Sequence, residues 1–263
     1  MNDQDKRAIR ATAHVLADAA RVETLRYFRG AAFALEDKGV GRFDPVTEAD
    51  RSSERAMRAI LAERRPDDGI LGEEYGVSAG TSGLTWVLDP VDGTRAFMSG
   101  IPMWGVLIGV WDALGPIYGL IDQPYIGERF EGGFGVAEMV GPHGTRPLRT
   151  RQSPGIAQAT MLSTFPEIGT SEEHAAFRRV ADRVRLVRYG LDCYGYALLA
   201  AGQVDLVIEA GLQPYDVAAP IAVIEAAGGI VTDWQGGPAK DGGRLLAAAD
   251  AAIHASALEL LRG

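Results

Sequence analysis

The chain has too little cysteine for a fold held by disulfides or centred on a cysteine-bound zinc ion. Its 263 residues include one cysteine, Cys193, so no internal disulfide can form. No segment approaches the roughly 20 apolar residues of a membrane helix. The N-terminal residues 1–28 carry charges throughout and lack an apolar stretch of signal-peptide length. We therefore expect a cytoplasmic protein without a membrane partner.

The chain also has fewer basic than acidic residues. Lys and Arg number 26 against 35 Asp and Glu, which gives a net charge of −9 and a pI of about 5.0. Nucleic acid as a main partner is excluded on this ground, because a phosphate backbone demands clustered Lys and Arg. A hydrophobic content of 47% is ordinary for a globular chain of this length.

The order of apolar and polar residues predicts an α/β fold with a mixed sheet. Helical periodicity is found over residues 6–29, from 47 onward, and over 172–185, 194–201 and 217–227. Strand patterns occupy residues 69–72, 85–88, 106–111, 117–121, 128–133, 161–164, 186–189, 205–209 and 230–234. An aperiodic stretch over 145–154 marks a boundary between residues 1–150 and 151–263, which we expect to form one integrated catalytic unit.

Acidic residues collect where predicted strands meet helices or turns. They are Asp50, Glu73 with Glu74, Asp89 with Asp92, and Asp216. Carboxylates at the ends of neighbouring strands converge on one crevice of an open sheet, and they repel one another unless a cation lies between them. The four histidines are remote in sequence from these acids, so all-oxygen ligands favour Mg²⁺, Mn²⁺ or Ca²⁺ over zinc.

Each acidic segment also has a purely structural interpretation. Thr47 and Asp50 have the spacing of a capping box, and Asp216 suits a helix N-cap. Glu73 and Glu74 could form a solvated turn, and Asp92-Gly93 is a common turn dipeptide. These interpretations explain the segments singly but not their joint occurrence after buried strands.

The residues that follow Asp92 suit a phosphate. Backbone N–H groups at Gly93, Thr94 and Arg95 can bind phosphate oxygens if a turn or helix begins there. The Thr94 hydroxyl can orient a water molecule. A metal together with a phosphate therefore accounts for the Gly-Thr pair as well as for the aspartates.

The segment Asp89-Pro90-Val91-Asp92-Gly93-Thr94 resembles the D-P-x-D-G-T signature of the inositol monophosphatase-like, Mg²⁺-dependent phosphatases. Three further segments resemble motifs of that family and follow its order and spacing. They are Gly72-Glu73-Glu74, the stretch over 44–50, and Tyr215-Asp216-Val217-Ala218-Ala219. The likeness extends over nearly the whole chain.

The resemblance implies a layered αβαβα sandwich, a homodimer, and a small phosphorylated metabolite as substrate. It implies two or three Mg²⁺ ions, replaceable by Mn²⁺, with ligands Glu73, Asp89, the carbonyl of Val91, Asp92 and Asp216. It also implies a catalytic set of Asp50, Thr94 and Glu73, and phosphate contacts from Gly93, Thr94 and Arg95.

Several stretches look closest to the histidinol-phosphate phosphatase branch, among them residues 94–97, 121–124, 189–194 and 205–212. The resemblance then implies that Asp192 and Glu209 neutralise the ammonium and imidazole of L-histidinol phosphate. Leu191 departs from the glycine of that branch. A loop cap at Asp192 and a strand-end charge at Glu209 are the structural alternatives.

Other functions stay open on the sequence. Inositol phosphates, fructose 1,6-bisphosphate and a nucleoside bisphosphate are alternative substrates within the family. A second substrate phosphate would need basic residues, for which five arginines between 178 and 188 are candidates. A non-catalytic metal-binding homologue is the remaining alternative, although none of the expected ligands is missing.

Overall fold

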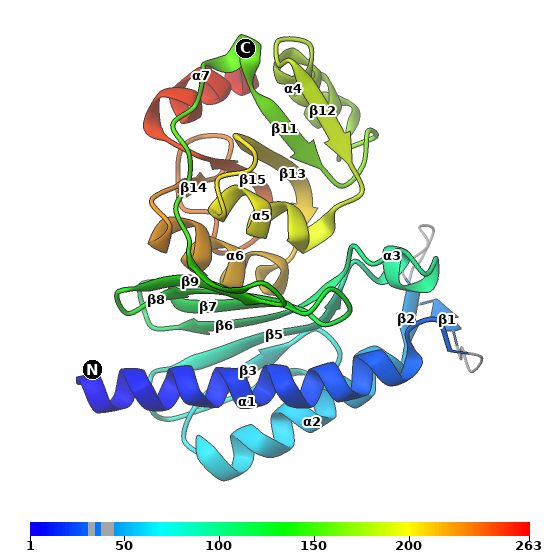
Figure 1. Cartoon of the computed structure of the whole chain (residues 1–263), viewed down its shortest axis with the longest axis vertical. Helices are drawn as coiled ribbons and strands as arrows, with labels where there is room; N and C mark the ends of the chain where they lie inside the picture. The colour runs from blue at the N-terminus through cyan, green and yellow to red at the C-terminus, as the bar shows by residue number, and fades with distance from the viewer. Residues whose placement is uncertain (31–34, 38–44) are drawn as a thin grey trace.

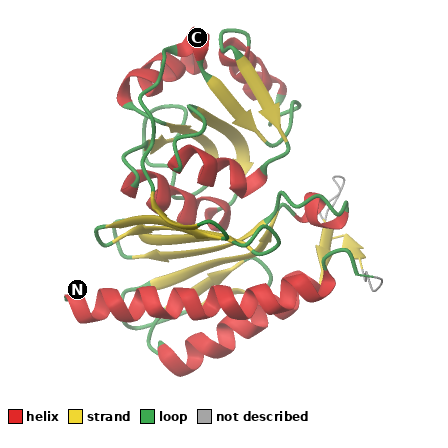
Figure 2. Ribbon diagram, in the orientation of Figure 1, coloured by secondary structure: helices red, strands yellow, loops and turns green. Residues whose placement is uncertain are grey.

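The computed structural model describes residues 1–30, 35–37 and 45–263, and within them it has five alternating layers of helices and sheets (Figures 1 and 2). Helices α1 (Asp3–Tyr27) and α2 (Glu48–Arg64) cover one face of a large sheet, and α5 (Asp192–Ala200) and α6 (Pro214–Ala226) cover its other face. A second sheet follows, with α4 (Ser171–Ala181) and α7 (Ala251–Arg262) outside it. The αβαβα sandwich expected from the sequence is confirmed.

The large sheet has eight strands and is almost entirely antiparallel. Its strands in spatial order are β10 (Gly144–Pro147), β9 (Val136–Gly141), β8 (Glu128–Gly133), β7 (Pro116–Gln123), β6 (Gly105–Trp111), β5 (Thr85–Asp92), β3 (Gly69–Gly72) and β4 (Gly76–Ser78). Strand β3 runs parallel to β5, which brings the chain that follows each strand to the same edge.

The smaller sheet has five strands. In spatial order they are β12 (Leu186–Tyr189), β11 (Thr160–Ser163), β13 (Leu206–Leu212), β15 (Gly243–Ala248) and β14 (Ile230–Thr232). Strand β11 is parallel to both of its neighbours, so this sheet is mixed as well. The remaining elements are short: β1 (Leu35–Asp37) paired with β2 (Pro45–Thr47), α3 (Thr94–Met98) and the 3₁₀ turn η1 (Ile156–Gln158).

Helix α1 shows how sequence spacing produces the outer layer. Its buried positions Ile9, Ala13, Leu16 and Ala20 recur every three or four residues, which aligns them along one face. That face packs in one core cluster with α2 and the large sheet. Asn2 caps the helix by accepting a hydrogen bond from the N–H of Asp5 at 2.9 Å.

Helix α6 lies unusually close to the large sheet because three glycines face it. Gly109, Gly119 and Gly132 are register partners across β6, β7 and β8. A Cβ atom at Gly119 would lie 2.3 Å from the carbonyl oxygen of Ala219, and one at Gly109 would lie 2.6 Å from the Cβ of Ala218. The glycine line therefore sets how closely α6 approaches the sheet.

The structure adds elements that the sequence patterns did not predict: β1, β2, β4, β9, β10, η1, β15 and α7. Helix α4 ends at Ala181, four residues earlier than expected, because the N–H of Arg185 bonds the carbonyl of Ala159 at 3.1 Å at the start of a strand pair. Among the described residues, no helix has the length and apolar character needed to cross a membrane.

Candidate active site

Strand β5 presents two carboxylates on one side because its pairing with β6 contains a bulge. Asp89 pairs with Leu107 and Asp92 with Gly105, so three steps along β5 match two along β6. Residues three apart in a regular strand point to opposite faces, and the extra residue turns Asp92 back toward the side of Asp89. Pro90, which has no N–H, lies in this irregular part of the ladder.

Local hydrogen bonds fix the chain through the bulge. The N–H of Val91 donates to Oδ1 of Asp89 at 3.0 Å, and the hydroxyl of Thr94 donates to the carbonyl of Val91 at 3.1 Å. Because the Thr94 proton is used in this way, its oxygen presents lone pairs that can accept a hydrogen bond from water. Gly93 has a φ of +88°, and a Cβ there would lie 3.0 Å from Cγ of Asp192, so glycine is required.

Asp216 comes from the C-terminal part of the chain, in the first turn of α6. Its Oδ2 accepts a hydrogen bond from the N–H of Gln213 at 2.7 Å, which completes a capping box. The same side chain joins Asp89 and Asp92 in a cluster in which one oxygen of each carboxylate lies within 4.8 Å of the others. The capping role and the cluster are therefore compatible, since a carboxylate accepts several hydrogen bonds.

The electrostatics of this cluster call for a cation. Burial raises the pKa of Asp89 well above its usual range, and the charges of Glu73, Asp92 and Asp216 raise it further. Burial also raises the pKa of Asp92, although the N–H of Cys193, which donates to it at 2.5 Å, opposes the shift. A divalent ion among these carboxylates would reverse the repulsion that adds to the pKa shift of Asp89.

Glu73 reaches the cluster from the neighbouring strand. Its N–H donates to the carbonyl of Leu88 at 3.1 Å, which continues the parallel pairing of β3 with β5.

Glu54, which is fully buried on α2, accepts a hydrogen bond from the N–H of Glu74 at 2.7 Å and so holds the loop that carries Glu73. A Cβ at Gly72 would lie 2.0 Å from Glu54 Oε1. The sequence analysis missed Glu54; its signal was an acid on the buried face of an amphipathic helix.

Asp50 is buried at the start of α2. Its Oδ2 accepts hydrogen bonds from the N–H of Thr47 at 2.9 Å and from the Thr47 hydroxyl at 2.5 Å, so the capping interpretation holds. Burial, followed by the charge of Glu74, raises the pKa of Asp50 to about 6, against the effect of these hydrogen bonds. Asp44, at the start of the same motif, lies outside the described residues.

Glu209 is buried in the middle of β13, at the residue after which the pairing of β13 with β15 becomes irregular. Its Oε1 accepts hydrogen bonds from the N–H of Thr164 at 2.6 Å and from the Thr164 hydroxyl at 3.0 Å. Burial raises its pKa to about 8; the Thr164 hydrogen bonds oppose this and the charge of Asp92 adds to it. Thr164, which the sequence analysis did not select, therefore orients the predicted substrate-binding carboxylate.

Asp192 lies near enough to Asp92 and to Glu209 to interact with both charges. Burial raises its pKa well above the usual range, the charges of Asp92 and Glu209 raise it further, and the charge of Arg95 opposes them. The Arg95 guanidinium lies 5.0 Å from the centre of the Phe165 ring, a cation–π contact that joins α3 to the loop after β11. The structure thus brings Arg95, Asp192 and Glu209 to one region next to Asp92.

Leucine at position 191 needs no unusual backbone. Leu191 has φ −108° and ψ −10°, which any residue adopts. The left-handed residues of this loop are Gly190, with φ +79°, and Asp192, with φ +45°. Aspartate tolerates that conformation better than most side chains, so the sequence departure at Leu191 does not distort the loop.

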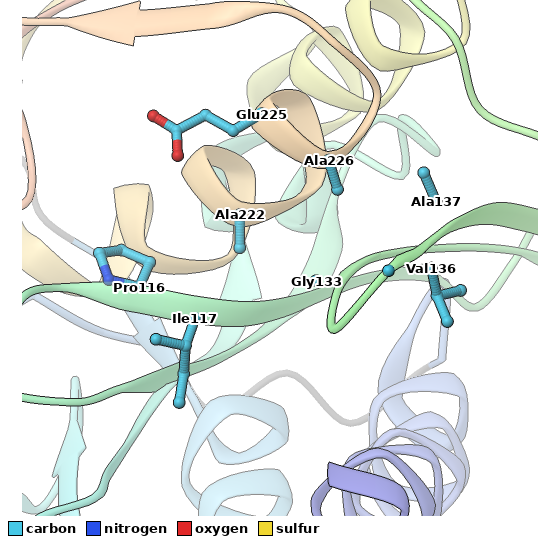
Figure 3. A pocket seen from close by; sticks show the side chains of 9 residues that line it. Pro116, Ile117, Gly133, Val136, Ala137, Ala222, Glu225 and Ala226 are labelled. Atoms are coloured by element: carbon cyan, nitrogen blue, oxygen red, sulfur yellow. The ribbon is translucent and has the colours of Figure 1, made fainter. Parts of the chain in front are cut away.

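A separate cavity of about 310 Å³ lies between α6 and the ends of β7 and β8 (Figure 3). Its lining residues are Pro116, Ile117, Gly133, Gly135, Val136, Ala137, Ala222, Glu225 and Ala226. These side chains are mostly small and apolar, and they include none of the acids described above. We therefore assign the chemistry to the carboxylate cluster and not to this cavity.

Comparison with known proteins agrees with the geometry. The model of the inositol monophosphatase family matches residues 5–262. The chain belongs to the inositol monophosphatase family. Members of this family hydrolyse phosphate monoesters, so the chain is a phosphomonoesterase.

The proteins that are similar to this family member have different names, and some of these names include a substrate. The chain is 40% identical to the chloroplastic bifunctional phosphatase IMPL2 of Arabidopsis thaliana, over 99% of this chain and 77% of the relative. It is 34% identical to a histidinol-phosphatase of Streptomyces coelicolor, over 92% of each. An inositol monophosphatase structure from Zymomonas mobilis matches 100% of both chains, with a TM-score of 0.86 and 36% identity.

Proposed function

We propose that this phosphatase hydrolyses L-histidinol phosphate to L-histidinol and phosphate with Mg²⁺, a step of histidine biosynthesis. The observation that carries the proposal is the position of Asp192 and Glu209 beside the cluster of Asp89, Asp92 and Asp216. The cluster suits the phosphate end through a metal. The two further carboxylates suit the ammonium and the imidazole at the other end of the substrate.

The residues of the cluster fit a hard divalent cation. Three carboxylates within 4.8 Å of one another, buried enough to raise the pKa of Asp89, are a donor set of oxygens alone. Such a set suits Mg²⁺ or Mn²⁺ better than zinc. We propose that Glu73, the carbonyl of Val91 and these three aspartates hold two or three ions. When bound, the metal supplies Lewis-acid stabilisation of the phosphate and lowers the pKa of water.

The chain's own residues then position the reactants. The Thr94 oxygen accepts a hydrogen bond from the attacking water, because its proton is donated to Val91. Asp50, whose pKa is raised to about 6, serves as the acceptor of a water proton on the N-terminal side of the site. The N–H groups of Gly93, Thr94 and Arg95 bind the phosphate oxygens.

Inositol 1-phosphate is the second candidate substrate. The side chains of Asp192 and Glu209 can accept hydrogen bonds from the hydroxyls of a polyol as well as from nitrogen. The likeness to the Zymomonas mobilis inositol monophosphatase favours this alternative.

Bisphosphate substrates receive less support from the arginines of α4. Arg178 pairs with Asp182, and Arg179 donates to the carbonyls of Leu260 and Leu261 at 2.7 and 2.6 Å. These two guanidinium groups are therefore engaged within the outer layer of the sandwich, on a different helix layer from α6 (Figure 1).

We also propose that residues 1–150 and 151–263 act as one catalytic unit and that the enzyme is a homodimer. The first range supplies Asp89 and Asp92 and the second supplies Asp216. Either range produced alone should therefore bind metal far more weakly than the whole chain. Light scattering of the purified chain would test the dimer.

A panel of phosphate esters tests the proposed substrate. Phosphate release from L-histidinol phosphate, inositol 1-phosphate and fructose 1,6-bisphosphate is measured with Mg²⁺ and again with excess chelator. We expect the highest kcat/KM for histidinol phosphate and no release with chelator. A higher kcat/KM for inositol 1-phosphate would reject the proposed substrate and keep the reaction class.

A further inference from the structure

Tyr196 has a buried hydroxyl that the proposed reaction does not yet use. It lies on α5, four residues after Asp192, and its side chain is 4% exposed. The hydroxyl has no hydrogen-bond partner among the described residues. A buried polar atom without a partner destabilises the folded state. Such atoms are rare in native proteins, and one near a functional site suggests a role in that site.

The hydroxyl lies close enough to the carboxylates of the site to interact with their charges. After burial, the charges that raise the pKa of Tyr196 well above its usual range are those of Glu209, Asp92 and Asp216, in that order. The phenol therefore keeps its proton and remains a hydrogen-bond donor. The charges that act on it are those of two proposed metal ligands and of the carboxylate proposed to meet the alcohol part of the substrate.

Glu209 has capacity for the missing hydrogen bond. Thr164 donates twice to its Oε1, whereas among the described residues Oε2 receives only a long hydrogen bond of 3.4 Å from the Ser163 hydroxyl. A carboxylate oxygen accepts about two hydrogen bonds. Oε2 is consequently the weaker-held oxygen of the pair and the acceptor that a Tyr196 donor can complete.

We propose that Tyr196 is a positioning residue that donates a hydrogen bond to Glu209 when Glu209 holds the alcohol part of the substrate. The inference rests on the proposed phosphatase function and adds a residue that acts through Glu209. Since Tyr196 Oη is itself buried, it orders the carboxylate and does not touch the ligand. The orphan hydroxyl is then a feature of the ligand-free protein, retained for binding at the expense of stability.

A double-mutant cycle tests the proposal. Tyr196→Phe, Glu209→Gln and the double variant are assayed with Mg²⁺ on L-histidinol phosphate, inositol 1-phosphate and p-nitrophenyl phosphate, which has no N–H or O–H donor on its alcohol part. On the better of the first two esters, Tyr196→Phe should raise KM about five- to tenfold and change kcat by less than about twofold. In the Glu209→Gln background it should add no further loss, and p-nitrophenyl phosphate should be unaffected.

Tyr118→Phe is the matched control. The Tyr118 hydroxyl is equally buried but donates to Oε2 of Glu131 at 2.7 Å, between the large sheet and α1. Its loss should lower the urea midpoint without changing KM, whereas Tyr196→Phe should match or exceed the wild-type midpoint. This contrast separates a binding role from general destabilisation.

Three results for Tyr196→Phe would overturn the proposal, and a fourth would reject the proposed function. A KM effect of Tyr196→Phe that is the same on all three esters, or that adds fully to the effect of Glu209→Gln, overturns the proposal. So does an unchanged KM in an active Tyr196→Phe variant. If the wild-type enzyme releases phosphate from none of the three esters, the proposed function itself fails, and the inference fails with it.

Discussion

Replacing Gly119 with alanine should move α6 away from the large sheet and weaken the metal site. The new Cβ would lie 2.3 Å from the Ala219 carbonyl oxygen and 2.8 Å from its Cα, both backbone atoms that cannot rotate aside. An ordinary contact is about 3.5 Å, so the helix must shift by roughly 1 Å. Asp216 is carried on this helix, within 4.8 Å of the β5 carboxylates.

We expect this overpacking to cost about 1–3 kcal/mol of unfolding free energy and the shift of Asp216 to weaken Mn²⁺ binding about tenfold. Urea unfolding followed by circular dichroism measures the first, and titration calorimetry with Mn²⁺ measures the second. A Gly80→Ala variant, whose Cβ would lie 2.1 Å from the N of Gly69 and far from α6, should lose stability but keep its affinity for Mn²⁺.

Gly109 and Ala218 allow a compensating double variant to be tested. Gly109→Ala should behave like Gly119→Ala, because its Cβ would lie 2.6 Å from the Cβ of Ala218. Adding Ala218→Gly removes the opposing atom and should restore both stability and Mn²⁺ affinity. Unchanged Mn²⁺ affinity in folded Gly119→Ala, or a double variant no better than Gly109→Ala, would refute the idea that the glycine line positions Asp216.

Three further predictions address charge and metal. Asp92→Asn should lower kcat by about 10²-fold or more while the far-ultraviolet circular dichroism stays that of the wild type; near wild-type turnover would reject Asp92 as a ligand. Burial raises the pKa of Asp68, but hydrogen bonds from Arg65, Ser82 and Trp86 outweigh burial and lower it below its usual value. The contribution of the ionised Asp68 to the free energy of unfolding is therefore complete above the unfolded pKa of about 3.9. It is lost as the pH falls through the lower folded pKa. Asp68→Asn should therefore cost about 1–3 kcal/mol at pH 7 and progressively less below about pH 4 in urea titrations; a deficit that is constant down to pH 2 would contradict this. Mg²⁺ at about 100 times its Kd should stabilise the wild-type protein by about 2.7 kcal/mol and Asp92→Asn by clearly less, as read from thermal unfolding with and without chelator.

Much of the first half of the fold could be predicted because its elements carry local signals. The start of α2 follows from Thr47 and Asp50, which form the expected capping box. Strand β8 has the bounds that its pattern indicates. The expected strand over 85–88 extends to Asp92, because the register shift accommodates Pro90 inside the sheet.

Other elements depend on contacts that no local pattern encodes. Strand β10 is exposed along its whole length and exists through pairing with β9. Strand β15 is defined by its place between β13 and β14. Helix α7 did carry a signal, since Ile253, Ala257 and Leu261 are buried at a spacing of four.

The residues of the site also differ in whether a local sequence signal could predict them. Asp89, Asp92 and Asp216 could be grouped from motifs, and the structure places them together. The roles of Glu54 and Thr164 arise from burial and from hydrogen bonds over long sequence separations, and that of Tyr196 arises from a buried hydroxyl without a partner among the described residues. A sequence pattern gives no distance between a helix residue and a distant loop, so these residues required the three-dimensional structure.

The most direct test of the account is the rate of phosphate release from L-histidinol phosphate by the wild-type chain across a Mg²⁺ titration, with Asp92→Asn measured in parallel. Release should saturate with Mg²⁺, vanish with chelator and be nearly absent in the variant. Release that is independent of Mg²⁺, or equal in the two proteins, would contradict a metal-dependent site built on the β5 and α6 carboxylates.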